Sequence, residues 1–140
     1  MKAARTISLA ISMDWMPTLL AAAGVSSDPA FPPDGVNLLP MLAQSAPVVE
    51  RRLFWRYKAN AQRAARDGDY KYLKILDNTF LFNVVDDPME RANLKERRKD
   101  VYERIVADWG AWNATMLPEI PDSAAETYTA AQLADHIGLA

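Results

Sequence analysis

A few residues of this 140-residue chain have types and spacing that could serve a chemical function. The most numerous are basic side chains along one stretch, because guanidinium and ammonium groups pair with anionic ligands. The candidates for contacts to an anionic substrate are Arg56, Arg63, Arg66 and Lys71, with Lys74 in the same stretch. The alternative for each of them is a solvated or salt-bridged strand edge, which is the default for surface charge.

The acidic and histidine side chains give weaker evidence of a functional site than the basic ones. Asp86 and Asp87 are adjacent, but a metal ion needs three or more converging ligands, and no neighbouring residues supply the others. Asp14 comes directly before an apolar run, in the position of a helix N-cap that accepts hydrogen bonds from the free N–H groups of the first turn. The lone His136 has no proton-transfer partner that can be named. We therefore predict no catalytic residue and no metal ligand in this chain.

Composition narrows the class of protein. Half of the residues are hydrophobic and 24% are charged, an ordinary balance for a globular domain. The net charge of −2 argues against a nucleic-acid or anionic-membrane partner, which would require a clustered basic excess. The absence of cysteine excludes disulfides, zinc–thiolate sites and a cysteine nucleophile, and it leaves the cellular compartment open. The apolar run at 7–11 is too short to span a membrane.

The basic candidates lie in a stretch, Arg52–Val85, that is rich in aromatic and β-branched residues, which indicates strands. Asp67-Gly68 predicts a type I′ hairpin turn with positive φ at both residues, and Asp77-Asn78 predicts a second turn. We expect an antiparallel meander of three or four strands. Leu53 and Phe54 lie on opposite faces, so both faces are at least partly apolar and each needs a cover.

Helices are predicted on both sides of this meander. Alternating residues at 6–12 form a strand or extended arm, and a helix follows over Trp15–Ala23, which Gly24 ends. A Pro-rich connector at 28–47 carries one helical turn at Leu39–Leu42. An amphipathic helix over Val101–Met116, with Asp100 and Glu103 as a capping box, covers one sheet face. A tail over 119–140 with a short helix at 130–136 completes the chain.

Four motifs now stand in order along the chain. They are Asp-x-x-Pro-Thr at Asp14–Thr18, Asp-Gly-x-x-Leu at Asp34–Leu38, Ala-x-Arg-x-Gly-x-x-Lys-Tyr at Ala64–Tyr72, and Asp-Pro-x-Glu-x-x-Asn-Leu at Asp87–Leu94. This series resembles the C-terminal part of the arylsulfatase family. The resemblance covers roughly residues 6–116, and it departs from the family pattern at Asn83 and Lys99, where Asp and Pro are usual.

The resemblance implies an α+β fold: a small antiparallel β-meander packed on a C-terminal amphipathic helix, preceded by a strand-helix arm. Residues 1–47 would be that arm and the Pro-rich connector, from the end of the large α/β domain. Residues 48–140 would be the small C-terminal subdomain with its tail.

The resemblance also implies what this chain lacks. A sulfatase hydrolyses sulfate esters with a formylglycine made from Cys or Ser in Cys/Ser-x-Pro-x-Arg, and with a divalent cation, usually calcium, on upstream Asp and Asn residues. This sequence has no such motif and no upstream aspartate pair. We therefore predict a C-terminal fragment of a sulfuric ester hydrolase, catalytically incomplete by itself, with no cofactor of its own.

Two other functions are open. The chain is alternatively a free-standing protein- or carbohydrate-binding module that uses the aromatic sheet. It is, as a second alternative, a single-strand nucleic-acid binder, although the net charge opposes this. The aromatic residues that lie among basic ones there are Phe54, Trp55, Tyr57, Tyr70 and Tyr72. Whatever its function, we expect the isolated chain to form a homo-oligomer, through the exposed sheet face or through exchange of the 6–23 arm, because large exposed apolar patches mark interfaces.

Overall fold

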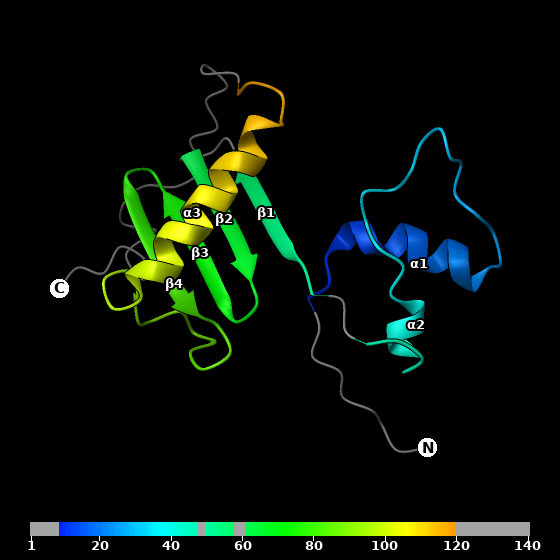
Figure 1. Cartoon of the computed structure of the whole chain (residues 1–140), viewed down its shortest axis with the longest axis horizontal. Coiled ribbons are helices and arrows are strands. Elements are labelled where there is room, and N and C mark those ends of the chain that lie inside the picture. Colours follow the sequence, from blue (N-terminus) through cyan, green and yellow to red (C-terminus); the bar gives the residue numbers. More distant parts are fainter. Residues whose placement is uncertain (1–8, 48–49, 58–60, 120–140) are drawn as a thin grey trace. The chain divides into compact units, whose positions relative to one another are not determined.

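The computed structural model describes residues 9–47, 50–57 and 61–119, and the chain forms two compact units, Met1–Arg51 and Arg52–Ala140. Figure 1 shows the helices α1 and α2 in the first unit and the sheet with helix α3 in the second. Arg51 belongs to the first unit because its side chain pairs there with Asp14. The division therefore falls after Arg51, a few residues beyond the boundary at 47/48 that the sequence suggested. No helix among the described residues is long and apolar enough to cross a membrane.

The first unit contains a 3-10 turn, η1 (Ser12–Asp14), and two helices, α1 (Trp15–Ala22) and α2 (Leu39–Leu42). Gly24 ends α1 with φ of +69°. Its N–H donates to the carbonyl of Ala21 at 3.1 Å, and the next N–H, of Val25, donates to Leu20 at 2.9 Å. These two bonds form a Schellman motif, which confirms the predicted helix stop.

Two expectations for this unit have different outcomes. The single helical turn predicted at Leu39–Leu42 is confirmed as α2. The expected strand falls partly on residues 1–8, which lie outside the described residues, and residues 9–11 form no strand. Ile11 is nevertheless extended, with φ of −136° and ψ of 158°.

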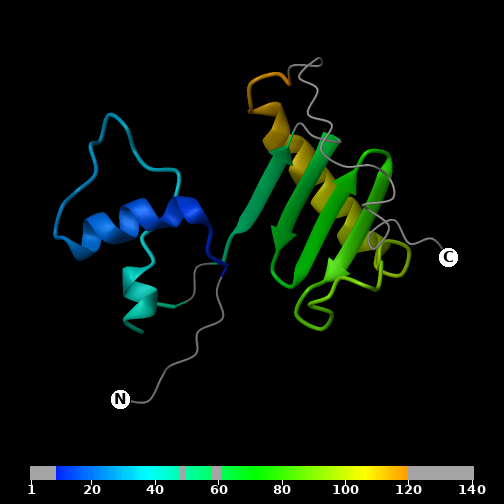
Figure 2. The ribbon, with the colours of Figure 1, turned by 180° about the vertical axis from the view of Figure 1, so that it is seen from behind.

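The second unit is a four-stranded antiparallel sheet in the order β1-β2-β3-β4 (Figures 1 and 2). Its strands are β1 (Arg52–Tyr57), β2 (Gln62–Asp67), β3 (Tyr70–Ile75) and β4 (Asn78–Asn83). Each strand pairs with the next along the chain, so the predicted meander is confirmed, with four strands.

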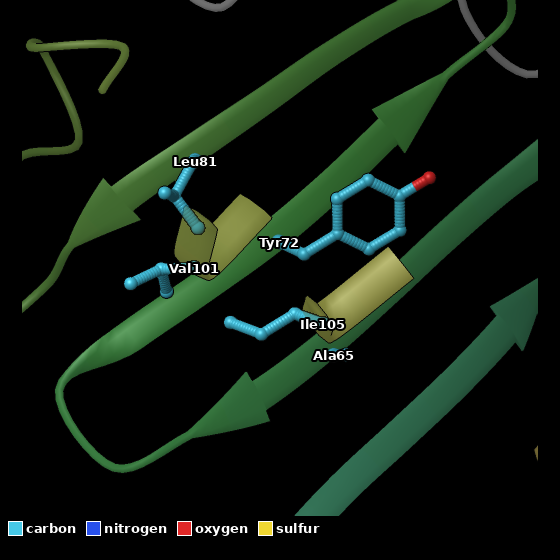
Figure 3. Packing of buried hydrophobic residues seen from close by; sticks show 5 residues of the cluster. All are labelled: Ala65, Tyr72, Leu81, Val101 and Ile105. Atoms are coloured by element: carbon cyan, nitrogen blue, oxygen red, sulfur yellow. The ribbon is translucent and has the colours of Figure 1, made fainter. Parts of the chain in front are cut away.

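Helix α3 (Lys99–Ala114) lies across one face of this sheet, as Figures 1 and 2 show from opposite sides. Cross-strand partners form the row beneath it, from β1 to β4: Phe54, Ala65, Tyr72 and Leu81. Val101 and Ile105 of α3 pack on this row, and Figure 3 shows them close to Tyr72 and Leu81. The α+β architecture of the prediction is therefore confirmed.

The start of α3 differs from the prediction. The helix begins at Lys99, and its N-cap is Arg98, which makes no capping bond through its side chain. Asp100 therefore lies inside the first turn and Glu103 beyond it, and the two form no capping box. The preference of helix N-caps for acidic residues favoured Asp100. The hydrogen-bonded turn before the helix, in which the N–H of Arg98 donates to the carbonyl of Leu94 at 2.8 Å, leads into a helix that begins at Lys99 instead.

Both hairpin turns lie one residue away from their predicted positions. Asp67 pairs with Tyr70, so the β2–β3 loop consists of Gly68 and Asp69. Only Gly68 has positive φ, +53°, which is the pattern of a type II′ turn, and the predicted type I′ turn is wrong. In the β3–β4 loop the same place is taken by Leu76, also with φ of +53°.

The face of the sheet away from α3 is only partly open. Its two phenylalanines, Phe80 and Phe82, are buried, as are Leu53 and Ile75. The large side chains exposed on this face, Trp55 and Tyr57, both belong to β1. The large exposed apolar side chains of this face are thus confined to β1.

Both edges of the sheet are blocked at their centres. On β4, the N–H of Leu81 donates to Asn93 Oδ1 at 3.0 Å, and its carbonyl accepts the N–H of Leu94 at 2.7 Å. On β1, the carbonyl of Trp55 accepts the indole N–H of Trp109 at 3.0 Å. Edge groups that are already bonded cannot pair with another strand, so these contacts oppose edge-to-edge association.

Candidate functional site

The most organised polar group of the chain is the carboxylate of Asp14, which is buried in the first unit with 1% of its surface exposed. It accepts the backbone N–H of Ile11 at 2.8 Å and that of Val36 at 3.0 Å. Arg51 binds it with both terminal nitrogens, Nη1 to Oδ1 at 2.9 Å and Nη2 to Oδ2. A buried charge needs such partners, because an unpaired one would cost several kcal/mol.

The ionisation of Asp14 follows from these contacts. The hydrogen bond from Arg51 is the largest influence and, with the N–H groups of Ile11 and Val36, it lowers the pKa of the carboxyl from 3.8 to about 2 although burial opposes this. The carboxylate does not cap α1, since no capping bond links its side chain to the first turn. Asp14 therefore occupies the N-cap position of α1 as predicted, but the predicted hydrogen bond from its carboxylate to the first turn is absent. A group charged throughout the neutral range is not a proton donor there.

Two further contacts join the same segments. Thr18 is buried on α1, and its Oγ1 accepts the N–H of Leu38 at 2.9 Å. Gly35 lies so close to the turn before α1 that a Cβ on it would be 2.1 Å from the carbonyl oxygen of Met13 and 2.8 Å from Asp14 Cα. Only glycine fits at this approach.

The first two sequence motifs are thus the two sides of one structure, which we call the Asp14 clamp: Asp14, Thr18, Gly35 and Arg51. Sequence reasoning identified Asp14 and noted Gly35 only as part of a motif, and it missed Arg51. No local signal pointed to Arg51, because its partner is 37 residues away in the sequence.

The fourth motif, Asp87–Leu94, forms a loop against β4. Asp87 Oδ2 accepts the N–H groups of Arg91 and Ala92 at 2.7 and 2.8 Å. The residue of this loop with a left-handed conformation is Glu90, with φ of +55°. Asn93 uses its amide on the β4 edge, where Oδ1 accepts from Leu81 and Nδ2 donates to the carbonyl of Thr79 at 3.2 Å.

The four basic candidates lie on opposite faces of the sheet. Arg56 pairs across strands with Arg63 on the α3 face. Arg56 donates to Asn113 Oδ1 at 3.2 Å and to the Leu117 carbonyl at 2.6 Å. Arg63 binds Glu119 at 2.6 Å, and its guanidinium lies 5.4 Å from the centre of the Trp109 ring. Both therefore hold the end of α3 and the segment after it.

Arg66 and Lys71 are cross-strand partners on the other face. Lys71 Nζ binds both oxygens of Glu90, at 2.7 and 2.8 Å, and so ties the fourth motif to the sheet. Arg66 donates from Nε to the carbonyl of Gly68 at 2.7 Å, and burial lowers the pKa of its guanidinium. The sheet separates this pair from Arg56 and Arg63, so the four residues form no single anion site, and a substrate contact for any of them stays a prediction.

Two cavities accompany these groups. One of about 440 Å³ in the first unit has a mostly apolar lining that includes Ile11, Trp15 and Leu42 beside Asp14. The other, of about 410 Å³, lies in the second unit and mixes Asp86 with Arg97 and other polar residues. In the part of the chain that the structure describes, no three His, Cys, Asp or Glu side chains converge as a metal site would require.

Comparison with solved structures gives this fold a relative. A putative sulfatase from Bacteroides thetaiotaomicron VPI-5482 matches 72% of this chain at 27% identity with a TM-score of 0.52. A 2-O GAG sulfatase matches 72% at 26% identity with a TM-score of 0.50. This chain resembles the C-terminal part of sulfatases.

The structural matches cover most of this chain but only a small part of each matched protein. Ps i-CgsB matches 81% of this chain with a TM-score of 0.63 at 23% identity. The match spans 26% of Ps i-CgsB and 23% of each of the two sulfatases, so this chain corresponds to about a quarter of their length. No family model and no curated protein matches the sequence.

Proposed function

We propose that this chain is the C-terminal segment of a sulfuric ester hydrolase and is catalytically inert by itself. The observation that carries the proposal is the extent of the structural match, about three quarters of this chain against one quarter of each sulfatase. In this proposal the chain has a structural role in its parent, and the catalytic residues belong to the other three quarters.

The contacts of the motif residues support a structural role. Asp14, Thr18 and Gly35 hold the first unit together, and Glu90 and Asn93 fasten the Asp87–Leu94 loop to the sheet. Each of these side chains uses its polar atoms or its small size on the chain itself. Residues committed to internal bonds in this way stabilise a fold and leave no free group for substrate chemistry.

The chemistry expected of a sulfatase also lacks its residues in this chain. The sequence contains no cysteine and no Ser-x-Pro-x-Arg, from which a formylglycine nucleophile would be made. Calcium would require converging oxygen ligands, and the described residues offer no such group. The parent's nucleophile and calcium ligands would therefore be supplied by polypeptide upstream of the matched quarter.

Two measurements test this proposal. The purified chain, incubated with an aryl sulfate and calcium, should release no sulfate above the buffer rate. Turnover that a substitution within the chain abolishes would overturn the claim of inertness. Sequencing the source genome upstream of the Met1 codon should reveal a Cys-x-Pro-x-Arg or Ser-x-Pro-x-Arg in the same reading frame, and an in-frame stop without that motif would contradict a sulfatase parent.

A second function is favoured by the exposed aromatic side chains of β1. Trp55 and Tyr57 lie on one face, two residues apart, and are 39% and 51% exposed. Such a pair could bind a carbohydrate or a peptide as a free-standing module. The nucleic-acid alternative is weaker, because Tyr72 is buried and Phe54 stacks on Trp112 at 5.5 Å, which removes both from base stacking.

A further inference from the structure

Three positively charged side chains stand side by side on the face of the sheet that carries α3. Arg56 of β1 is the cross-strand partner of Arg63 of β2, and Arg63 is the partner of Lys74 of β3. Directly opposite residues share a face of the sheet, so the three form one row, which we call the basic row. Like charges directly opposite one another destabilise a sheet, so an anionic group beside this row would stabilise it.

The described residues offset only part of this charge. Within 9–47, 50–57 and 61–119, the one carboxylate that forms an ion pair with the basic row is that of Glu119, whose Oε2 lies 2.6 Å from Arg63 Nη2. The other groups that accept hydrogen bonds from the row are neutral: the side-chain oxygen of Asn113 and the carbonyls of Gln62 and Leu117. Three cations thus face one anion, and the surplus favours a further negative charge at this place.

Arg63 has the surroundings of an anion-binding residue. Its side chain is only 15% exposed, and its guanidinium lies 5.4 Å from the centre of the Trp109 ring. The indole N–H of Trp109 is fixed in turn by the carbonyl of Trp55, at 3.0 Å. A guanidinium shielded in this way binds an oxyanion more strongly than an exposed one, because water screens the pair less.

Glu119 is held at the basic row by its charge and not by burial. It follows α3, which ends at Ala114, and its own side chain is 41% exposed. Leu117 is 82% exposed, so little apolar burial holds this segment on the sheet. An ion pair with an exposed partner contributes little to stability. An oxyanion from solution can therefore compete with the Glu119 carboxylate for Arg63 without unfolding the sheet.

We propose that the basic row binds an oxyanion of the size and charge of sulfate, and that Glu119 occupies this site as a displaceable internal ligand. The proposal rests on the contacts and charges of the second unit and does not depend on the sulfatase assignment. It includes two of the residues that the sequence suggested for contacts to an anion, Arg56 and Arg63, and it leaves out the two on the other face of the sheet.

A titration of the complete chain with sodium sulfate tests this site, with sodium chloride at equal ionic strength as the control for screening. The NMR signal of the Trp109 indole N–H reports on the site, because the guanidinium of Arg63 lies over the Trp109 ring. We expect this signal to shift to saturation with sulfate and hardly at all with chloride.

Substitutions separate a binding site from a purely structural ion pair. Arg63→Met should weaken sulfate binding at least ~10-fold. Lys74→Met, which leaves the contacts of α3 to the sheet in place, should weaken it about 3-fold through lost charge alone. Arg91→Met removes an exposed cation of the same unit outside the row and is the matched control, with binding unchanged.

Glu119→Gln tests the internal ligand, because it keeps every cation and removes the competing carboxylate. It should tighten sulfate binding by roughly 2- to 5-fold, the factor that corresponds to an exposed ion pair. Unchanged or weaker binding by this variant would show that Glu119 is a structural partner of Arg63 and not a ligand of the site. A Trp109 signal that responds equally to sulfate and chloride, or sulfate binding that survives both Arg63→Met and Lys74→Met, would overturn the site itself.

Discussion

Single residues of the first unit join segments that are far apart in the sequence. Asp14 alone brings together the start of α1, the 34–38 segment and Arg51. An aspartate directly before a helical run, as at Asp14, predicts a helix N-cap, because capping is a common role of aspartate in that position. The carboxylate instead finds stronger, charged partners from a distance, and a guanidinium with two bonds outcompetes the N–H groups of one helical turn.

We expect Asp14→Asn to destabilise the first unit by about 2 kcal/mol at neutral pH, the free energy that corresponds to a pKa lowered from 3.8 to about 2. Because the folded-state pKa is the lower one, the unfolded chain binds the proton first as pH falls. The stabilisation is therefore complete above about pH 4 and is lost as pH falls to about 2. Hydrogen exchange of the α1 amides across this range measures the opening free energy.

Two comparisons make this prediction strict. Asp34→Asn removes an exposed carboxylate of the same unit and should change the opening free energy little. Arg51→Met should cost more than Asp14→Asn, because it leaves a buried carboxylate without its cation. A difference between wild type and Asp14→Asn that persists unchanged at pH 2 would show that the ion pair is not its cause.

Gly35 provides a second test at the residue scale, which depends on steric fit and not on charge. Gly35→Ala would place a Cβ 2.1 Å from the carbonyl oxygen of Met13, so the backbone must move, and we expect a loss of about 1–3 kcal/mol in the first unit. Gly110→Ala is the matched control, because no atom lies within 4 Å of its Cβ position inside α3. That variant should be neutral or stabilising by up to ~1 kcal/mol, and both free energies come from urea unfolding.

At the scale of elements, strands and helices were predictable and their junctions were not. Aromatic and β-branched residues indicate β1, β3 and β4, because side-chain type favours strand formation. β2 has no such residue, and only the hairpin predicted around Asp67-Gly68 indicated it. The turn residues were offset by one position, since the pairing of Asp67 with Tyr70 and of Ile75 with Asn78 decides which residues form each loop. Register depends on the buried row under α3, which no single strand encodes.

The two hairpin turns form a natural pair of variants. Gly68 and Leu76 occupy equivalent loop positions with the same φ of +53°, a conformation that costs a non-glycine residue ~1–2 kcal/mol. Gly68→Leu should therefore destabilise the second unit by about 1 kcal/mol, and Leu76→Gly should stabilise it by a smaller amount, because glycine also loses more chain entropy. Leu76 is 43% exposed, so little packing is lost. Thermal unfolding of both variants measures the two changes.

The sign of each effect decides the interpretation. Equal destabilisation by both substitutions would mean that the Leu76 side chain contributes more through packing than its φ costs. An unchanged melting temperature for Gly68→Leu would show that the β2–β3 loop does not need positive φ at this residue. The double variant should combine both changes, since the two turns lie at opposite ends of β3.

At the scale of the whole molecule, the sequence was informative about the fold and about the sulfatase likeness, and much less about a site. The order of the four motifs along the chain was enough to indicate the sulfatase likeness, and the structural comparison agrees with it. A site needs side chains that converge, and alternation along strands sends Arg56 and Arg66 to opposite faces. That outcome depends on the exact strand bounds, which composition leaves open.

The division into two units leads to the last prediction. The hydrophobic cluster of the second unit is formed within it by residues that include Ala65, Tyr72 and Ile105, and the Asp14 clamp is formed within the first. Ile105→Ala removes a side chain that is 1% exposed and should cost the second unit about 2–5 kcal/mol. Hydrogen exchange should then accelerate in β2, β3 and α3 and stay unchanged in α1.

Asp14→Asn should give the reciprocal result, faster exchange in α1 with β3 unchanged, because the bonds it removes all lie in the first unit. Proteins open in cooperative units that often coincide with such compact parts. Faster exchange in both units from either substitution would mean that the chain unfolds as one cooperative body. The protection of α1 would then depend on the second unit as well as on the Asp14 clamp.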